Sequence, residues 1–457
     1  MDLGTAQHPL KVAVVGSGPS GFYATEALVK TGKVVEVNML ERLPVPYGLV
    51  RNGVAPDHPK LKQAIKVYAG IAESPGFHYF GNVAVGRDLS IDELRRTHHA
   101  VVLTYGAETD RRLGIPGEDL PGSHTATEFV GWYNGHPDYR DRTFDFSHEQ
   151  AVVIGQGNVA ADVARILAKT VDELRSTDIA EHALSALAES SIKTIYVIGR
   201  RGPAQAKFTS KEVREFGELV ACDPFVDKSE LVLNPESESE LAEKSNAGAA
   251  KVYELFKEFT ERPPGAKTRR AVFTFLKSPR EIIGESRVEK VILERNSLSG
   301  EAFAQSARGT GEMLELQAGL LFRSIGYHGV AMPGVPFDER RGVIPNDEGR
   351  VLDSGSAVQG LYAAGWIKRG PTGIIGTNRA DSVGTINSLL KDAAGWPPDK
   401  GKRGAEAISQ LLNERGIRYV SFDDWKIIDQ AEIERGRPLG KPREKFTLVS
   451  EMLDLLV

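Results

Sequence analysis

The sequence predicts an α/β protein built from two Rossmann-like dinucleotide-binding domains. Two βαβ patterns carry a glycine-rich turn between strand and helix, at residues 16–21 and again at residues 155–160. A later apolar strand enters a further glycine-rich turn at residues 360–365, as though the chain returned to its first domain. At 457 residues the chain is also too long for one ordinary core, which agrees with two domains.

The first βαβ unit is predicted from the alternation of apolar runs and turns. A long loop rich in proline and glycine follows it at residues 43–58. The elements expected in this part are a strand at 11–15, a helix at 22–30, and strands at 34–40 and 100–103, with another helix at 60–72.

The second unit repeats the pattern from Ala151. Its expected elements are a helix at 159–169 and strands at 194–198, 271–276, 288–293 and 320–325. Residues 230–250 are acidic and small, which indicates a mobile surface segment or a polar helix. We therefore predict a first domain made of residues 1–106 and 328–457, interrupted by a second domain at residues 107–327.

Composition narrows the function. The net charge of −5, with both signs interspersed, argues against bulk attraction to nucleic acid. Cys222 is the single cysteine, so a disulfide framework, a C-x-x-C redox pair and a protein-held iron–sulfur cluster are excluded. The histidines show no metal-ligand spacing, and no metal site is expected. Redox chemistry would therefore need a bound organic cofactor.

The amino terminus shows no signal peptide, and no apolar run is long enough to span a bilayer. We expect a cytoplasmic protein without an integral membrane segment. A protein of an organellar matrix whose presequence is absent would have the same appearance.

The first turn fits the G-x-G-x-x-G fingerprint with Gly16, Gly18 and Gly21. The first glycine permits a tight turn, the second lets a pyrophosphate approach the backbone, and the third lets the helix pack on the strand. Glu41 follows 20 residues later, at the end of the next strand, where its carboxylate can accept hydrogen bonds from both ribose hydroxyls. A glycine turn of purely structural use is the alternative.

The second turn, Gly155-Gln-Gly157-Asn-Val-Ala160, is followed by a strand that ends in Arg200-Arg201 and not in an acid. Guanidinium groups pair with a phosphate dianion that a carboxylate would repel, so NADPH is favoured over NADH. Paired arginines in a solvated surface turn remain the alternative. Since Glu41 suits an unphosphorylated ribose, we expect FAD at the first site and NADPH at the second.

A last glycine-rich stretch, residues 369–377, precedes a predicted helix at 380–390. The positive end of such a helix would suit a flavin ring edge that gains negative charge on reduction. Trp366 stands at the exit of the preceding strand, where it either covers a ring of a cofactor or packs in the core.

These residues resemble the adrenodoxin-reductase type of NADPH:ferredoxin reductases. The resemblance runs over nearly the whole chain, and its longest stretches are idiosyncratic. The matching stretches are residues 16–23, 46–59, 80–83, 129–134, 155–165, 197–203 and 365–373.

The resemblance implies an FAD domain interrupted by an NADP domain, with the ligand positions of the family. FAD would be held by Ser20, Glu41, Leu49, Val85, Trp366, Gly373, Ile374 and Ile375. NADP would be held by Gln156, Gly157, Asn158, Val159, Arg200, Arg201, Glu212 and Gly373. His58 and Glu215 match positions near the flavin that influence turnover, although His58 before Pro59 could simply close a turn and Glu215 could face solvent.

The implied reaction passes a hydride from NADPH to FAD and then single electrons to a ferredoxin-type iron–sulfur protein, which could serve a downstream acceptor such as a monooxygenase. The acidic segment at 230–250 departs from the basic docking surface of the family, which leaves the identity of the partner open. Two alternatives remain: a flavin reductase with a quinone or other small-molecule acceptor, and a non-catalytic dinucleotide-sensing protein.

Overall fold

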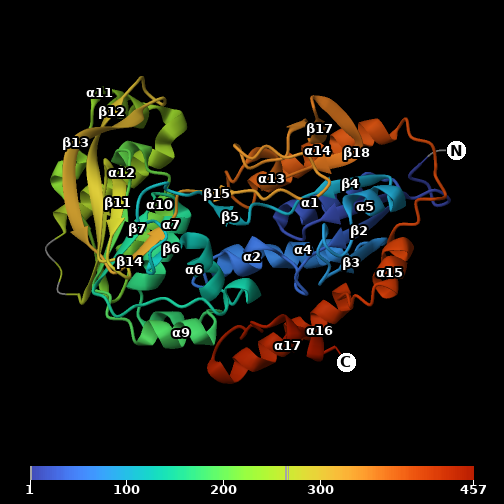
Figure 1. The fold of residues 1–457 in the computed structure, drawn as a ribbon, viewed down its shortest axis with the longest axis horizontal. Helices are drawn as coiled ribbons and strands as arrows, with labels where there is room; N and C mark the ends of the chain where they lie inside the picture. The colour runs from blue at the N-terminus through green and yellow to red at the C-terminus, as the bar shows by residue number, and fades with distance from the viewer. Residues whose placement is uncertain (1–2, 263–264, 266, 457) are drawn as a thin grey trace. The chain divides into compact units, whose positions relative to one another are not determined.

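The computed structural model describes residues 3–262, 265 and 267–456. Its contacts divide the chain into two compact units (Figure 1), Met1–Thr109 with Tyr327–Val457 as the first and Asp110–Gly326 as the second. The short strands β5 (Thr109–Asp110) and β15 (Tyr327–His328) pair where the chain leaves the first unit and returns to it. The predicted α/β fold class is confirmed. The predicted assignment of each domain to a cofactor stays a prediction.

The first unit is built on a seven-stranded sheet in the order β16-β17-β18-β4-β1-β2-β3. The five strands from β18 to β3 run parallel, and β16 and β17 add an antiparallel edge. The strands are β1 (Leu10–Val15), β2 (Val35–Leu40), β3 (Phe77–Phe80), β4 (Ala100–Leu103), β16 (Asn346–Asp347), β17 (Arg350–Asp353) and β18 (Ser356–Ala363).

Both faces of this sheet are covered, which explains why its strands are almost continuously apolar. Successive side chains of a strand point to opposite faces, so Val12 and Val14 of β1 pack in one core and Ala13 and Val15 in the other. The first core includes α1 (Pro19–Val29), α4 (Ala64–Ala72), α14 (Thr377–Ala393) and α16 (Phe422–Gly436). The second includes α5 (Ile91–Thr97), α13 (Trp366–Arg369) and α15 (Ala405–Glu414).

The second unit contains a six-stranded sheet in the order β6-β14-β7-β8-β10-β9, and all of its strand pairs are parallel. A separate antiparallel sheet consists of three long strands. The parallel strands are β6 (Ser123–Thr125), β7 (Gln150–Ile154), β8 (Thr194–Ile198), β9 (Cys222–Val226), β10 (Arg269–Thr274) and β14 (Leu320–Arg323). The antiparallel strands are β11 (Lys277–Ile283), β12 (Lys290–Ser299) and β13 (Ser306–Gln317).

The same alternation divides the two cores of this unit. Ala151 and Val153 of β7 pack with the helices, whereas Val152 and Ile154 pack against the antiparallel sheet. The helices of this unit are α6 (Ala126–Tyr133), α7 (Asn158–Ala168), α8 (Val171–Leu174), α9 (Glu181–Ala188), α10 (Ser210–Phe216), α11 (Pro235–Ala242) and α12 (Ala247–Glu261).

The remaining helices are short. In the first unit they are α2 (Leu49–Asn52), α3 (Pro59–Lys62), α17 (Val449–Asp454) and the 3₁₀ turn η5 (Arg437–Leu439). In the second unit they are the 3₁₀ turns η1 (Pro137–Tyr139), η2 (Pro203–Gln205), η3 (Lys228–Leu231) and η4 (Lys244–Asn246). Within the described parts of the chain, no helix combines the length and the apolar character that crossing a bilayer requires.

One region differs from the elements expected from sequence, and a second agrees with one of two alternatives. The helix expected at 60–72 is divided into α3 and α4, because the amides of Gln63 and Lys66 donate to carbonyls three residues back and tighten the junction. The acidic segment at 230–250 has α11 as its central part, which agrees with the expected alternative of a polar helix, and Glu240 is buried there.

Candidate dinucleotide-binding sites

In the first glycine-rich turn, a side chain would clash with the backbone at two of the three glycines and would find free space at the other one. Gly16 has a φ of +106°, and a Cβ there would lie 2.8 Å from Tyr105 Cα. A Cβ at Gly21 would lie 2.1 Å from the carbonyl oxygen of Gly16. A Cβ at Gly18, in contrast, would meet no described atom within 4 Å. The first and third glycines therefore serve the turn and the packing of α1, and the second opens the backbone to a ligand.

The amino terminus of α1 also suits an anion. Gly18 is its N-cap residue, Pro19 and Ser20 begin its first turn, and no side chain of the described residues caps it. Free amides and the positive end of the helix dipole point to the open side of such a turn. These features fit the pyrophosphate of a dinucleotide.

Glu41 lies at the end of β2, beside the first turn. Its Oε2 accepts hydrogen bonds from Ser17 Oγ at 2.7 Å and from the Ser17 amide at 3.1 Å. Its Oε1 accepts one from the Leu43 amide at 3.2 Å. The carboxylate is thereby held in one orientation, and it retains lone pairs that could accept the hydroxyls of a ribose.

Other predicted FAD residues belong to loops that contact this turn. The Tyr47 amide donates to the Ser17 carbonyl at 3.0 Å, and a Cβ at Gly48 would lie 3.0 Å from Gly18 Cα. Leu49, which begins α2 and is 37% exposed, is therefore carried next to the fingerprint. Val85 follows Val83, whose amide donates to the Glu41 carbonyl at 2.8 Å.

The chain that returns at β18 packs directly on the first turn. Gly365 has a φ of +78°, and a Cβ there would lie 2.0 Å from Ser20 Oγ. Ser382 of α14 donates to the Ser20 carbonyl at 3.1 Å. The structure thus brings Ser20 next to the segment that contains Gly365 and Trp366, which is distant in the sequence.

Trp366 begins α13 and is tied to the same loop. Its indole Nε1 donates to the Thr372 carbonyl at 3.2 Å, and its ring centroid lies 5.3 Å from that of Tyr327. Gly373 has a φ of +83° and Ile374 is 65% exposed, just before α14 begins at Thr377. The loop from 373 to 375 is therefore accessible at the amino-terminal end of a 17-residue helix.

The second glycine-rich turn repeats the geometry of the first. Gly155 has a φ of +145°, and a Cβ there would lie 2.1 Å from the Ser324 carbonyl oxygen. A Cβ at Gly157 would meet no described atom within 4 Å. Asn158 begins α7, and its Oδ1 accepts a hydrogen bond from the Thr209 amide at 2.8 Å. This turn therefore also leaves an open cradle at a helix amino terminus.

Gln156 is directed across the end of β8. Its Nε2 donates to the Thr274 carbonyl at 3.1 Å, and a Cβ at Gly199 would overlap its amide. Only a glycine at position 199 leaves room for this side chain.

Arg200 and Arg201 follow β8 directly. Their carbonyl oxygens accept hydrogen bonds from Asn296 Nδ2 at 2.8 Å and from the Leu276 amide at 3.0 Å. Neither guanidinium forms an ion pair with a carboxylate of the described residues, and Arg200 is exposed. The backbone of this loop is thus fixed while its positive charges stay available to an anion.

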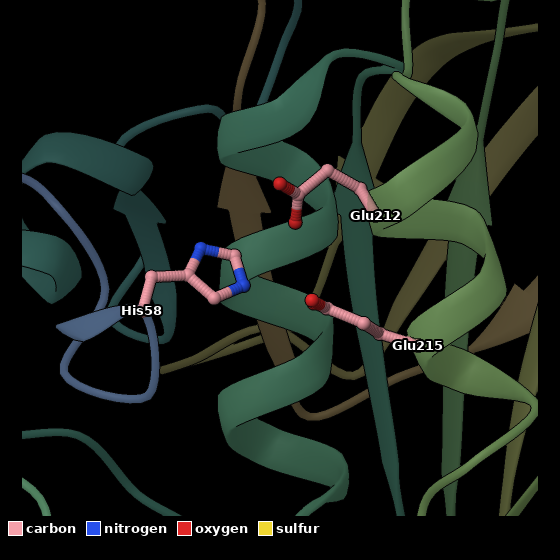
Figure 2. A group of neighbouring side chains, drawn as sticks. All are labelled: His58, Glu212 and Glu215. Carbon is pink, nitrogen blue, oxygen red and sulfur yellow. The ribbon is translucent and has the colours of Figure 1, made fainter. Parts of the chain in front are cut away.

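Glu212 and Glu215 lie on α10, and Figure 2 shows both side chains extending from that helix in the same direction. Arg165 of α7, a fully buried side chain, holds them. Its Nη1 donates to Glu212 Oε2 at 2.9 Å and lies 3.5 Å from Glu215 Oε2, and its Nη2 donates to Asp162 at 2.6 Å. The sequence analysis did not assign this buried guanidinium with its three carboxylates, although a charged residue among the apolar positions of α7 was the available signal.

His58 occupies the N-cap position of α3. It is 5% exposed, and its amide donates to the Ala55 carbonyl at 3.0 Å. The turn-closing interpretation describes its backbone correctly. The burial of its imidazole goes beyond what a surface turn requires.

A family model and several known proteins are similar to this chain. The family model described as pyridine nucleotide-disulphide oxidoreductase matches residues 10–198, from β1 to the end of β8. Cys222 lies outside that match and is the only cysteine of the sequence, so the chain cannot form an internal disulfide.

Two curated relatives match over nearly their whole length. The chain is 45% identical to the mitochondrial NADPH:adrenodoxin oxidoreductase of Salvelinus fontinalis, covering 97% of this chain and 91% of the relative. It is also 45% identical to the NADPH-ferredoxin reductase FprA of Mycobacterium leprae, covering 98% of each. The solved structure of Mycobacterium tuberculosis FprA in complex with NADPH is 43% identical and superimposes with a TM-score of 0.92 over 98% of this chain and 99% of that one. The chain therefore belongs to the adrenodoxin-reductase type of NADPH:ferredoxin reductases.

Proposed function

We propose that this protein is an NADPH-dependent FAD flavoprotein that delivers electrons from NADPH to a ferredoxin-type iron–sulfur protein. The observation that carries the proposal is the difference between its two nucleotide turns. Both leave an open cradle at the second glycine, but one is followed by Glu41 and the other by Arg200-Arg201. The names of the relatives describe the same coenzyme and the same class of acceptor.

FAD would bind to the first unit. When bound, the flavin accepts a hydride from NADPH and gives up electrons one at a time. Gly18 and the first turn of α1 would hold the pyrophosphate, and Glu41 would accept the ribose hydroxyls. The loop of Gly373, Ile374 and Ile375, at the start of α14, would place backbone amides and a helix dipole beside the ring edge that gains negative charge.

NADPH would bind to the second unit. Gly157 and α7 would hold the pyrophosphate, with Gln156, Asn158 and Val159 forming the wall of the turn. Arg200 and Arg201 would pair with the 2′-phosphate, which NADH lacks. Glu212, fixed by Arg165, is a hydrogen-bond acceptor of constant orientation on α10 and would orient the carboxamide end of the coenzyme.

His58 and Glu215 are proposed to influence turnover from positions near the flavin. His58 is buried among protein atoms, so a change of its imidazole would alter a packed environment. Glu215 lies 3.5 Å from the Arg165 guanidinium, which keeps its charge partly balanced. Replacing either residue should change kcat with little change in the affinity for NADPH.

The proposed partner is a ferredoxin, whose surface is generally acidic in encounters steered by charge. Several cations on the second unit are exposed, and some of them have partners. Lys257 pairs with Glu254 at 3.0 Å, and Lys267 lies 3.5 Å from Asp223. We propose a docking contact with modest steering, in a cytoplasmic or organellar-matrix compartment.

A spectroscopic titration tests the proposal. The purified yellow protein is titrated anaerobically with increasing NADPH or NADH, and an oxidised ferredoxin is then added. We expect flavin bleaching with NADPH at much lower concentration than with NADH, followed by reoxidation when ferredoxin is added. Bleaching without reoxidation by ferredoxin would favour a quinone or other small-molecule acceptor. Bound flavin that NADPH does not reduce would favour a non-catalytic dinucleotide-sensing protein.

A further inference from the structure

The loop that carries Arg200 and Arg201 rests on a buried polar cluster outside the two fingerprints. The loop continues into η2, which ends at Gln205, a residue only 7% exposed. Gln205 Nε2 donates to Ser237 Oγ at 3.0 Å and to Glu240 Oε2 at 2.9 Å. Both acceptors lie on α11, in the acidic segment to which the sequence assigned no function.

Glu240 joins this loop to the turn between β12 and β13. Its Oε1 accepts hydrogen bonds from Gln305 Nε2 and from the Phe303 amide, each at 2.8 Å. Gln305 Nε2 also donates to Ser237 Oγ at 3.0 Å. A carboxylate that is only 3% exposed is costly to bury unless donors surround it, and here three donors do so.

The charge of Glu240 is maintained in this setting. Burial raises the pKa of its carboxyl, but the hydrogen bonds from Gln305, Gln205 and Phe303 and the charge of Arg201 lower it more, so the pKa lies below its ordinary value. Glu240 is therefore ionised at neutral pH and within electrostatic reach of Arg201.

Gln205 belongs both to the cluster and to the segment that follows the paired arginines, and its side chain lies beside Gly202. A Cβ at Gly202 would lie 2.9 Å from Gln205 Oε1. On its other side the loop is fixed by Asn296 and Leu276, which donate to the carbonyls of Arg200 and Arg201. The segment from Arg200 to Gln205 is thus held at both ends by groups that contact no part of the glycine fingerprint.

We propose that Glu240 is a positioning residue for coenzyme selection, which holds the Arg200–Arg201 loop in the geometry that binds a 2′-phosphate. The inference rests on the proposed use of NADPH. A negative charge near Arg201 by itself repels a phosphate, so a carboxylate at this position is useful only through the geometry that it imposes. Paired guanidinium contacts to phosphate are strongly directional, and a displaced loop loses them while the adenosine contacts remain.

Calorimetric Kd values of two ligands for the FAD-containing protein distinguish the contribution of the 2′-phosphate from that of the rest of the adenosine nucleotide. Adenosine 2′,5′-bisphosphate contains the 2′-phosphate, and adenosine 5′-monophosphate lacks it. In Glu240→Gln the charged acceptor of the Gln205 amide is replaced by a neutral amide group, which weakens the link to the loop. We expect the Kd of the bisphosphate to rise about tenfold and that of the monophosphate to change less than about twofold.

Two further variants make the experiment decisive. Glu238→Gln changes an exposed carboxylate of the same helix and should leave both Kd values unchanged. Gln205→Met removes the link to the loop but keeps Glu240 with Gln305 and Phe303, so it should reproduce the selective loss even if Glu240→Gln fails to fold.

Equal changes for both ligands, no change, or tighter binding of the bisphosphate in both Glu240→Gln and Gln205→Met would overturn the inference. The wild-type protein distinguishes this failure from failure of the proposed function. If the wild type prefers the bisphosphate and the variants keep that preference, only the role of Glu240 is wrong. If the wild type shows no preference, the NADPH assignment itself is wrong.

Discussion

At the scale of single residues, we propose that Arg200 and Arg201 distinguish NADPH from NADH. Charge-assisted hydrogen bonds contribute about 1.5–3 kcal/mol each, so replacing either arginine with glutamine should raise KM for NADPH about tenfold to a hundredfold. The KM for NADH should stay nearly constant, because NADH offers no 2′-phosphate. Steady-state kinetics with both coenzymes measure the effect, and an equal rise for NADH would contradict the 2′-phosphate assignment.

Gly21 tests the packing of the first turn. A Cβ there would lie 2.1 Å from a backbone carbonyl oxygen, which cannot move aside as a flexible side chain would. We expect Gly21→Ala to lower the free energy of unfolding by about 3 kcal/mol or more and to reduce FAD retention.

The control for Gly21 is Gly70 of α4, where a Cβ would meet no described atom within 4 Å. Gly70→Ala should stabilise the protein by about 0.5–1 kcal/mol, because alanine is the better helix former. Similar effects of the two alanines in thermal unfolding would refute the role given to the third glycine.

His98 gives the stability a dependence on pH. Burial lowers the pKa of its imidazole from 6.5 to about 4, although a hydrogen bond to the Leu94 carbonyl acts in the opposite direction. Between these values the unfolded chain binds a proton that the folded chain does not, so stability falls as the pH drops from about 6.5 to 4, by up to about 3 kcal/mol. His99 and His124, whose pKa values burial also lowers, act in the same direction.

Thermal midpoints of the wild type and of His98→Gln measure this contribution. The variant should be less stable at pH 7.5 and should lose less stability on acidification to pH 4.5. Parallel curves would show that His98 is protonated equally in the folded and unfolded states.

At the scale of elements, the carboxy-terminal helix α16 supports the loop after β2. Glu432 of α16 is fully buried and accepts hydrogen bonds from Arg51 Nη1 at 2.9 Å, Arg443 Nη1 at 3.2 Å and the Phe446 amide at 3.1 Å. Arg51 belongs to α2, two residues after Leu49, a predicted FAD ligand. The helix therefore stabilises the backbone around that ligand.

Replacing Glu432 with glutamine leaves the buried Arg51 guanidinium without its counter-charge, whereas the partly buried Arg443 keeps its pair with Asp429. Breaking one partner of a buried pair costs about 3–5 kcal/mol, so we expect a clear drop in the thermal midpoint and faster loss of FAD on dilution. Glu434→Gln, an exposed position on the same helix, is the control and should change neither quantity. If Glu432→Gln released FAD at the wild-type rate, α16 would have no role in stabilising the loop that contains Leu49.

Hydrophobic periodicity predicts best those elements whose structure depends on their own local sequence. The strand at 194–198 and the strand at 100–103 have the predicted bounds, because both are short apolar runs between turn residues. The acidic segment was less predictable. Its order depends on Gln205 and Gln305, whose proximity to Glu240 arises from tertiary contacts 35 and 65 residues away.

The site shows the same division. The glycine turns, Glu41 and the paired arginines have local signatures, and the sequence indicates their use. Arg165 has only a weak local signature, a charged residue among apolar helix positions, because two of its partners lie on α10, 47 residues further along the chain in the case of Glu212. Residues that support a binding loop through tertiary contacts are not part of a local sequence motif, so a motif does not reveal them.

At the scale of the whole molecule, electrons follow one path, from NADPH through FAD to a one-electron carrier. The first unit contains Glu41, which is proposed to bind a ribose, and an accessible loop at the start of α14. The second unit contains the paired arginines and an open glycine turn. Neither unit contains a redox-active cysteine pair, since the chain has one cysteine. Electrons therefore leave through the cofactor to a separate acceptor.

Cytochrome c reduction by the purified protein, with and without an added ferredoxin and with NADPH or NADH, tests this central claim most directly. The account predicts a slow basal rate that ferredoxin strongly increases, with NADPH much the better donor. A rate that ferredoxin does not change, or that is equal with the two coenzymes, would contradict it.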